Sequence, residues 1–298
     1  WSPLYSGDGQ GILGLSENII RVIGKEGKWM SEAVNGRSDF EYGKFMDAIL
    51  NLTGLDLRNY KERQMRRRIN GLMDLLGVDS YAHYVRVLKD NPEKYDQFVK
   101  RLTINVSEFF RNPERWADLE KRFIPQLRTK QPNLKVWSAG CSNGPEPYSL
   151  AIMLADIAPQ GSHKIVASDV DKMVLGQATQ GEYGLQQLRY VSPARMEKYF
   201  IPLGDDRYQV KPEIKRMIHF KRQNLLTDTF EKNFDLILCR NVVIYFTEEA
   251  KHTLYQKFFQ ALRPGGILMV GGTEPLLKYR DYGFEAIETT FYRRPEVQ

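Results

Sequence analysis

The chain has 298 residues, a length typical of about two domains, and its 42% hydrophobic residues suffice for a sizeable core. It lacks the roughly 18 consecutive apolar residues that a membrane-spanning helix needs, and it opens without the basic and apolar segments of a secretory signal. It has only two cysteines. We therefore expect a cytoplasmic protein without membrane insertion or a disulfide framework. Four separated histidines without a Cys/His cluster predict no metal site, and the net charge of +6 favours an acidic partner.

Residues 1–38 precede the first predicted element and form an extension of unknown role. They are rich in glycine, and Gly9-Gln10-Gly11-Ile12-Leu13-Gly14 matches the spacing of the dinucleotide-binding fingerprint. That fingerprint requires a preceding strand within a βαβ unit, and neither is predicted here. We therefore interpret residues 1–38 as a flexible extension rather than a nucleotide site.

Residues 39–112 are predicted to form a small N-terminal helical domain. A first helix includes Phe45 to Leu52 and closes at Gly54. A second extends from about Arg58 to Leu76 and ends at Gly77. Two more follow at 81–88 and 95–102, separated by Asn91-Pro92.

The helix at 58–76 is predicted to be amphipathic. At 100° per residue, its apolar stripe contains Met65, Ile69, Leu72 and Leu76. The opposite face contains Arg63, Arg66 and Arg67. These arginines form either a docking patch for an acidic surface or an ordinary solvated helix face.

The hydrophobic period changes after residues 113–132, which we interpret as a polar, proline-containing connector. Short apolar runs then alternate with helical patterns over residues 133–298, and this alternation predicts an open α/β sheet. The runs lie at 134–138, 164–168, 234–239 and 266–270. At about 200–222 the turn signal Gly204-Asp205-Asp206 predicts a small antiparallel β insertion that ends in a strand at 217–221.

Polar residues follow two of the predicted strands, where open α/β sheets bind their ligands. Gly140 and Gly144 allow close approach of a ligand to the backbone, and Glu146 at the next helix start disfavours a pyrophosphate. Asp169 ends the second strand and is placed to accept hydrogen bonds from ribose hydroxyls. The pattern favours a cationic nucleoside such as S-adenosylmethionine. Alternatively, Asp169 caps the next helix and the glycines only shape the turn.

In the order of its motifs, the chain resembles the chemotaxis receptor methyltransferases, which are the CheR-type protein-glutamate O-methyltransferases. The match covers about residues 39–295. It depends on six motifs in the family's order: Thr103-Ile104-Asn105-Val106-Ser107-Glu108-Phe109-Phe110-Arg111, Trp137-Ser138-Ala139-Gly140-Cys141-Ser142-Asn143-Gly144, Glu146-Pro147-Tyr148-Ser149, Ala167-Ser168-Asp169-Val170-Asp171, Gln223-Asn224-Leu225-Leu226 and Cys239-Arg240-Asn241-Val242-Val243-Ile244-Tyr245-Phe246.

The resemblance implies a class I S-adenosylmethionine-dependent methyltransferase fold, a Rossmann-like sheet preceded by a helical domain. It implies S-adenosylmethionine as cofactor and S-adenosylhomocysteine as product. The family's cofactor contacts fall on Asn105, Ser107, Arg111, Glu146, Asp169, Asn224, Leu225, Asn241 and Val242. Because the first three precede residue 113, both domains are expected to cover the cofactor.

The resemblance also implies a substrate, the glutamate side chains on the cytoplasmic helical bundle of methyl-accepting chemoreceptors. Arg111 is the predicted orienting residue, because its planar fork can bind a carboxylate bidentately. Tyr245 is predicted to hydrogen-bond at the same edge. Alternatively, Arg111 pairs with Glu108 or Glu114 and Tyr245 is a core residue.

The sequence departs from the family pattern in two places. The first Glu of the usual Gly-Glu-Glu-Pro-Tyr-Ser motif is Pro145, although the second remains as Glu146. The insertion at about 200–222 is short, so we expect no tethering of the receptor's C-terminal pentapeptide. A monomer is expected.

Two other functions remain open from the residues alone. The basic charge and the arginine face would suit an RNA or DNA methyltransferase, but Asn241-Val242-Val243-Ile244-Tyr245 lacks the prolines of adenine-directed enzymes. A non-catalytic S-adenosylmethionine-binding signalling adaptor is the third possibility. The intact residues at Arg111, Glu146, Asp169 and Asn241 disfavour it. We expect no nucleic-acid partner.

Overall fold

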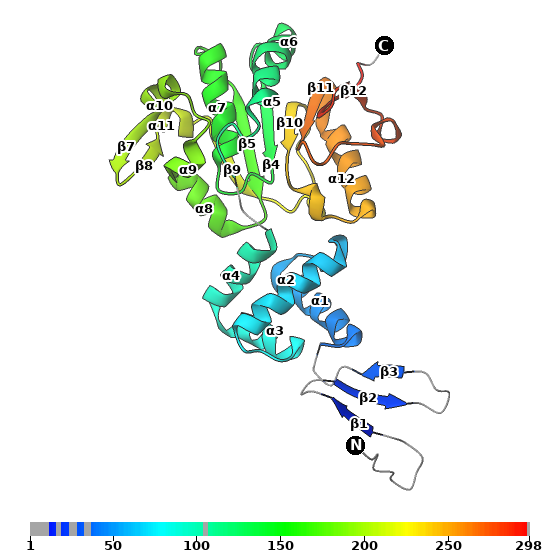
Figure 1. Ribbon diagram of the computed structural model, residues 1–298. Helices are drawn as coiled ribbons and strands as arrows, with labels where there is room; N and C mark the ends of the chain where they lie inside the picture. Colours follow the sequence, from blue (N-terminus) through cyan, green and yellow to red (C-terminus); the bar gives the residue numbers. More distant parts are fainter. Residues whose placement is uncertain (1–11, 16–18, 24–28, 33–36, 104–106, 297–298) are drawn as a thin grey trace. The chain divides into compact units, whose positions relative to one another are not determined.

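The computed structural model describes residues 12–15, 19–23, 29–32, 37–103 and 107–296. The chain divides into two compact units, residues 1–102 and 103–298 (Figure 1). Within the described ranges, no helix combines the length and apolarity needed to cross a membrane.

Three short strands lie within the N-terminal extension. β1 (Ile12–Leu15), β2 (Ile19–Ile23) and β3 (Trp29–Glu32) form an antiparallel sheet in the order β1-β2-β3. The prediction of a flexible extension is therefore wrong for these residues. Local composition was weak guidance here, because the backbone pairing between strands, such as Ile20 with Glu32, joins residues that are apart in the sequence.

The first unit also contains the predicted helices. These are α1 (Asp39–Thr53), the 3₁₀ turn η1 (Leu57–Asn59), α2 (Glu62–Leu75), α3 (Tyr81–Asp90) and α4 (Pro92–Thr103). Ser38 and Glu41 form a reciprocal capping box at the start of α1, and Gly54 ends that helix in the left-handed conformation. The apolar stripe of α2 is confirmed, since Met65 and Ile69 are buried in the helical core.

The second unit is built on a seven-stranded sheet in the order β12-β13-β11-β10-β4-β5-β9. Neighbours from β11 to β9 are parallel, and β12 and β13 are antiparallel at one side. The strands are β4 (Lys135–Ala139), β5 (Lys164–Asp169), β9 (Ile218–Arg222), β10 (Phe234–Cys239), β11 (Leu262–Val270), β12 (Glu285–Glu288) and β13 (Phe291–Arg293).

Helices cover this sheet. Val136 on β4 belongs to the core cluster that includes α7, whereas the neighbouring Trp137 makes an edge-to-face contact with Phe258 of α12, with ring centroids 5.5 Å apart. Successive residues of one strand thus face two apolar layers. The helices and turns are α7 (Pro145–Ile157), α8 (Lys172–Gln180), α9 (Leu185–Leu188), α10 (Pro193–Tyr199), α11 (Pro212–Lys215), η3 (Val243–Tyr245), α12 (Glu248–Ala261) and η4 (Tyr279–Tyr282).

The interpretation of residues 113–132 as a polar connector is wrong. They form α5 (Pro113–Asp118), the π-helical turn η2 (Leu119–Phe123) and α6 (Ile124–Lys130). Pro113 and Pro125 stand in the first turns of α5 and α6, where proline is tolerated. Leu119 and Ile124 are fully buried in the sheet's core cluster, so this segment belongs to the second unit.

The β insertion differs from its predicted limits. β7 (Phe200–Gly204) and β8 (Arg207–Val210) form the expected hairpin, and β6 (Glu182–Gly184) adds a third strand in the order β6-β8-β7. The strand predicted to end the insertion is instead β9, which pairs parallel to β5 in the main sheet. Sequence spacing could not show this, because β6 precedes the hairpin by more than a dozen residues.

The segment 107–112 belongs to the second unit rather than to the helical domain. Phe109 is fully buried, with its ring centroid 4.9 Å from that of Tyr183 and 5.3 Å from that of Phe200. The Phe110 amide donates to the Ser149 hydroxyl at 2.9 Å. These contacts explain why the predicted boundary at residue 112 lies too late in the chain.

Candidate active site

The carboxyl ends of β4, β5, β9 and β10 lie along one edge of the sheet, and the winding direction switches between β4 and β10. The loop after β4 bends over this edge, because the amides of Gly140 and Cys141 both donate to the Ser168 carbonyl, at 2.8 and 2.9 Å. Gly144 has φ 102°, and a Cβ there would lie 2.7 Å from the Tyr183 hydroxyl. The glycines therefore allow both the turn and its close packing.

Asp169 ends β5 and is only 8% exposed. Its Oδ2 accepts a hydrogen bond from the Ser142 amide at 2.9 Å, and its Oδ1 accepts from the Asp171 amide at 3.0 Å. Burial raises the pKa of Asp169, while these amide donors act to lower it. The N-cap of α8 is Asp171, whose carboxylate accepts from the Met173 amide at 2.8 Å. Helix capping therefore does not account for Asp169.

Glu146 lies in the first turn of α7 and forms a buried ion pair with Arg240, with 3.4 Å between Oε2 and Nη1. The Ser138 hydroxyl donates to its other oxygen at 2.8 Å. Burial raises the pKa of Glu146, and the Arg240 cation acts against that rise. Arg240 follows β10 directly and is 7% exposed, so the pair joins the start of α7 to the end of β10.

Arg240 also fixes the segment that contains Arg111. Its Nη2 donates to the Arg111 carbonyl at 2.7 Å and to Asn112 Oδ1 at 2.9 Å. The Arg111 cation acts to lower the pKa of Glu146, so its charge reaches the same cluster. Glu108, one proposed partner of Arg111, instead pairs with Arg189 at 2.8 Å.

Asn224 and Leu225 lie in the loop after β9. Lys257 of α12 anchors this loop, because its ammonium donates to the carbonyls of Leu225, Leu226 and Asp228 at 2.9, 3.2 and 2.7 Å. The Gln223 amide donates to the Asp169 carbonyl at 2.9 Å. The loop is thereby tied to both α12 and β5.

Asn241 and Val242 lie in the loop after β10, and the half-buried Tyr245 ends the turn η3 that follows. Asn241 has φ 60°. A Cβ on Gly140 would lie 2.5 Å from Val242 Cγ2, so Val242 packs against the loop after β4. The Asn241 amide donates to Glu274, which lies beyond the carboxyl end of β11.

The structure thus brings Glu146, Asp169, Asn241 and Val242 to one sheet edge, with Arg111 held against it through its backbone. Asn224 and Leu225 follow the neighbouring strand, and Ser107 is half-buried in the same unit. Asn105 lies outside the described residues. The prediction that Ser107 and Arg111 come from the helical domain is wrong, for the packing reasons given above.

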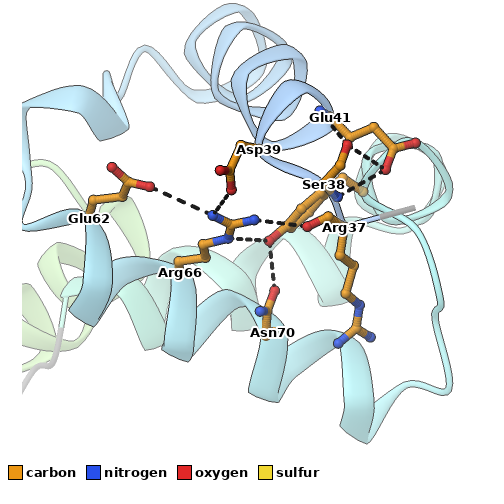
Figure 2. Close-up of polar contacts among 8 residues, drawn as sticks. Arg37, Ser38, Asp39, Glu41, Glu62, Arg66 and Asn70 are labelled. Atoms are coloured by element: carbon orange, nitrogen blue, oxygen red, sulfur yellow. Dashed lines mark hydrogen bonds and ion pairs between the residues drawn. The ribbon is translucent and has the colours of Figure 1, made fainter. Parts of the chain in front are cut away.

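The arginine face lies in the first unit, and Arg66 does not belong to a free docking patch. Figure 2 shows its guanidinium between neighbouring elements, where it contacts Asp39 Oδ1 at 2.5 Å and the Arg37 carbonyl at 2.8 Å. It also donates to the Tyr81 hydroxyl at 3.3 Å. Arg63 and Arg67 are exposed. Periodicity correctly placed all three off the apolar stripe, but Arg66 is bound by side chains that fold onto α2.

Among the described residues, no group of three or more His, Cys, Asp or Glu side chains could hold a metal ion. Cys141 and Cys239 are buried, and burial raises the pKa of both thiols well above the usual range. These thiols are therefore poor nucleophiles at neutral pH.

Comparisons with known proteins agree with this architecture. Residues 105–293 match the family described as "CheR methyltransferase, SAM binding domain", and residues 41–103 match "CheR methyltransferase, all-alpha domain". The chain belongs to the CheR methyltransferase family. The resemblance stated from the motifs is thereby confirmed, as is the class I methyltransferase fold with an N-terminal helical domain.

The chain is similar to three curated relatives named "Chemotaxis protein methyltransferase". It is 44% identical to one from Listeria innocua and 42% identical to one from Listeria monocytogenes, in each case over 85% of this chain and 96% of the relative. It is 32% identical to one from Salmonella typhimurium, over 80% of this chain and 84% of the relative.

Two solved structures show lower similarity. The glycopeptide N-methyltransferase MtfA complexed with S-adenosyl-L-methionine is 12% identical over 55% of this chain and 54% of that one, with a TM-score of 0.34. The N-methyltransferase NodS from Bradyrhizobium japonicum WM9 in complex with S-adenosyl-L-homocysteine is 16% identical over 52% and 60%, with a TM-score of 0.30.

The residues at the sheet edge fit the cofactor of this family. Glu146 and Asp169 bring buried carboxylates to an edge that would receive a ligand with a sulfonium and an amino group. The loop 140–144 contains no Lys or Arg that could bind a phosphate. S-adenosylmethionine is therefore the cofactor of the second unit.

Three contributors to this edge were not predicted as site residues: Arg240, Lys257 and Glu274. Arg240 could have been identified from its position, because it is a charged residue that directly follows the apolar strand β10 and such a residue needs a buried partner. Glu274 follows the last parallel strand, so the edge rule also applies to it. Lys257 gave no signal, since its role depends on the fold of a loop 30 residues earlier.

Replacing Arg240 with Met is expected to lower the free energy of unfolding by about 3–5 kcal/mol, because it leaves the Glu146 carboxylate buried without its cation. The loss should be larger at pH 8 than at pH 5. Burial raises the pKa of Glu146 in the folded state, so its ionisation destabilises the fold as the pH rises through that pKa. Urea unfolding monitored by tryptophan fluorescence measures this, since Trp116 and Trp137 are buried in the second unit.

The matched control is a double-mutant cycle with Glu146→Gln. The double variant should lose less stability than the sum of the two single variants. Additive losses at both pH values would contradict the coupling between the two side chains.

Proposed function

We propose that this protein transfers a methyl group from S-adenosylmethionine to glutamate side chains of chemoreceptors and forms glutamate methyl esters. The observation that carries the proposal is the fixed place of Arg111, which Arg240 joins to the sheet edge beside Glu146. That edge thereby combines a cation suited to a carboxylate substrate with carboxylates suited to a cationic cofactor. The names of the similar Listeria proteins support the same substrate class.

The residues proposed to hold the cofactor are those of the family motif. Asp169 retains lone-pair capacity beyond its backbone amide donors, and this would accept hydrogen bonds from ribose hydroxyls. Glu146 would stabilise the positive methionine end. Asn224 and Leu225 would frame the adenine. The remaining contacts would come from Asn105, Ser107, Arg111, Asn241 and Val242.

S-adenosylmethionine supplies the methyl group when bound, and the chain's own residues must orient the acceptor. A glutamate side chain with a pKa of about 4.3 is already ionised at pH 7, so the reaction requires no general base. Arg111 would hold the carboxylate oxygen in the line of attack, and Tyr245 would hydrogen-bond at the same edge. Positioning of this kind can lower a barrier by roughly 7–11 kcal/mol.

The exposed pair Arg63 and Arg67 is proposed as the docking patch for the acidic helical bundle of the receptor. Both line an open groove of about 840 Å³ on α2, together with Asn70 and Gly71. Arg66 lines the same groove but is held by Asp39, so it would shape the groove rather than bind the partner. We further propose a cytoplasmic monomer that needs no nucleic acid and no C-terminal receptor tether.

The proposed function is tested by incubating the protein with S-adenosylmethionine labelled on the methyl group, receptor-containing membranes and RNA. Base-labile label on the receptor, mapped to glutamates, is the expected result, because methyl esters hydrolyse in base. Label on RNA would replace the proposal with a nucleic-acid methyltransferase. Binding of the cofactor without transfer of its methyl group would replace the proposal with a non-catalytic signalling adaptor.

Replacing Arg111 with Ala is expected to lower the turnover of receptor methylation by roughly 100-fold at saturating cofactor, because the acceptor oxygen loses its orientation. Arg111→Lys should recover only part of the rate, since an ammonium lacks the planar fork. The matched control is Arg122→Ala, which removes an exposed guanidinium from the same unit. Near-normal turnover of Arg111→Ala would exclude Arg111 from the mechanism.

Asp169 and Asp171 allow a second comparison. Asp169→Ala is expected to weaken S-adenosylhomocysteine binding by roughly 10- to 100-fold, because hydrogen bonds to a charged acceptor are each worth about 1.5–3 kcal/mol. Asp171→Ala should instead cost about 1 kcal/mol of stability through loss of the α8 N-cap. Titration calorimetry and thermal unfolding measure the two effects. Equal loss of affinity in both variants would contradict the assignment of the ribose contact to Asp169.

Replacing Arg63 and Arg67 with Glu is expected to raise the KM for receptor roughly 10-fold at low salt, while cofactor affinity stays unchanged. High salt should reduce the difference, because it screens exposed charges. The double variant Arg86→Glu/Lys89→Glu is the matched control, since it makes the same charge change at exposed positions of α3. Unchanged kinetics at low salt, or an equal effect in the control, would contradict the docking patch.

A further inference from the structure

Glu274 is a buried carboxylate at the same sheet edge, and none of the proposed catalytic steps uses it. It lies four residues beyond β11 and is 7% exposed. Its Oε1 accepts a hydrogen bond from the Asn241 amide, in the loop after β10. The amides of Val243, Ile244 and Gly271 also stabilise its ionised form. A single carboxylate thus faces amides from two loops.

Gly271 leaves the space that the Glu274 carboxylate occupies. A Cβ on Gly271 would overlap Glu274 Oε1 and would lie 3.0 Å from the Asn241 nitrogen. The Glu274 amide donates to the Gly271 carbonyl at 3.1 Å, which turns the side chain back toward β10. The absence of a side chain at Gly271 is therefore what brings Glu274 and the 241–244 loop into contact.

The loop that Glu274 holds begins in a left-handed backbone conformation. Asn241 has φ 60°, in a region that glycine adopts freely and that asparagine tolerates better than most other residues. A non-glycine residue in this region still depends on a constraint from its surroundings. The hydrogen bond from its amide to Glu274 supplies that constraint at the residue that begins the loop.

We propose that Glu274 is a positioning residue whose ionised carboxylate holds Asn241 and Val242 in the conformation that binds S-adenosylmethionine, and that protonation of Glu274 weakens cofactor binding. The inference rests on the proposed cofactor contacts of Asn241 and Val242. Glu274 itself need not touch the cofactor.

Glu274 gains its proton within the physiological pH range. Burial raises the pKa of Glu274 to about 7, against the lowering effect of the surrounding amides. Its Oε2 has no hydrogen-bond partner among the described residues, so no hydrogen bond offsets the free-energy cost of removing this oxygen from water. As the pH falls through about 7, the carboxylate gains a proton and the loop loses part of its acceptor.

Three titratable groups of the described residues whose interaction with Glu274 bears on this pH range are Cys239, Tyr255 and Arg240. Cys239 at the end of β10 and Tyr255 of α12 are both neutral near pH 7, because burial raises their pKa values. Arg240 is the third, and its charge is also influenced by Glu274. Arg240 stays cationic at neutral pH even though burial lowers its pKa, so none of the three changes charge in the range where Glu274 does.

The test is the affinity for S-adenosylhomocysteine, measured by titration calorimetry from pH 6 to pH 8 with the full chain. Glutamine is an isostere of protonated glutamate. Glu274→Gln should therefore bind about 10-fold more weakly than the parent protein at pH 8, the equivalent of one charge-assisted hydrogen bond, and only about 2-fold more weakly at pH 6. The convergence at low pH is a signature that a purely structural role would not produce.

Two further variants sharpen the test. Gly271→Ala leaves the carboxylate intact but displaces it, and should reproduce the loss at pH 8. Glu285→Gln removes an exposed carboxylate from β12 and should change neither the affinity nor its pH dependence. Thermal unfolding of each variant establishes that it is folded.

A Glu274→Gln variant with the affinity and pH dependence of the parent protein would overturn the proposal. A constant ratio of affinities from pH 6 to pH 8 would overturn it as well, because protonation would then have no part in the effect. Failure of the proposed function is distinguishable. It would appear as normal cofactor binding, with Glu274 dependence intact, but without labelled receptor.

Discussion

The burial of Arg240 is the constraint on which the rest of the site depends. A guanidinium removed from water is costly unless its charge and its donors are satisfied. Glu146 supplies the opposite charge, and the Arg111 carbonyl and Asn112 Oδ1 accept hydrogen bonds from Nη2, whereas Nε has no hydrogen-bond partner among the described residues. The start of α7, the end of β10 and the segment before α5 therefore come together only in one arrangement. The same arrangement holds the backbone of Arg111 at the sheet edge that is proposed to receive the cofactor.

Three carboxylates share this edge, and each is held by different donors. Glu146 has the Arg240 cation and the Ser138 hydroxyl, Asp169 has backbone amides that include those of Ser142 and Asp171, and Glu274 has amides of two loops. Burial raises the pKa of all three. Amides stabilise the negative charge of a carboxylate without adding a full positive charge.

Much of the second unit was predictable, because its parallel strands are nearly continuous apolar runs and ligands of such sheets bind at the carboxyl ends. Asp169 and Glu146 were found in this way. Arg66 shows the opposite case. Helical periodicity placed it with Arg63 and Arg67, but Asp39 comes from a different helix, 27 residues away in the sequence. The local spacing of residues does not indicate when a side chain binds a partner that is distant in the sequence.

The sequence by itself determined the main alternation of strands and helices in the second unit, the motifs of the methyltransferase family and the side chains proposed to bind its cofactor, since local periodicity and residue chemistry express these directly. The tertiary structure alone decided which of the charged residues are committed to the fold. It moved residues 107–132 into the sheet domain, because Phe109 and Leu119 are buried there. It also joined Arg240 to Glu146 and Asn241 to Glu274. These pairs are 94 and 33 residues apart, and desolvation selects such partners only once the chain has folded.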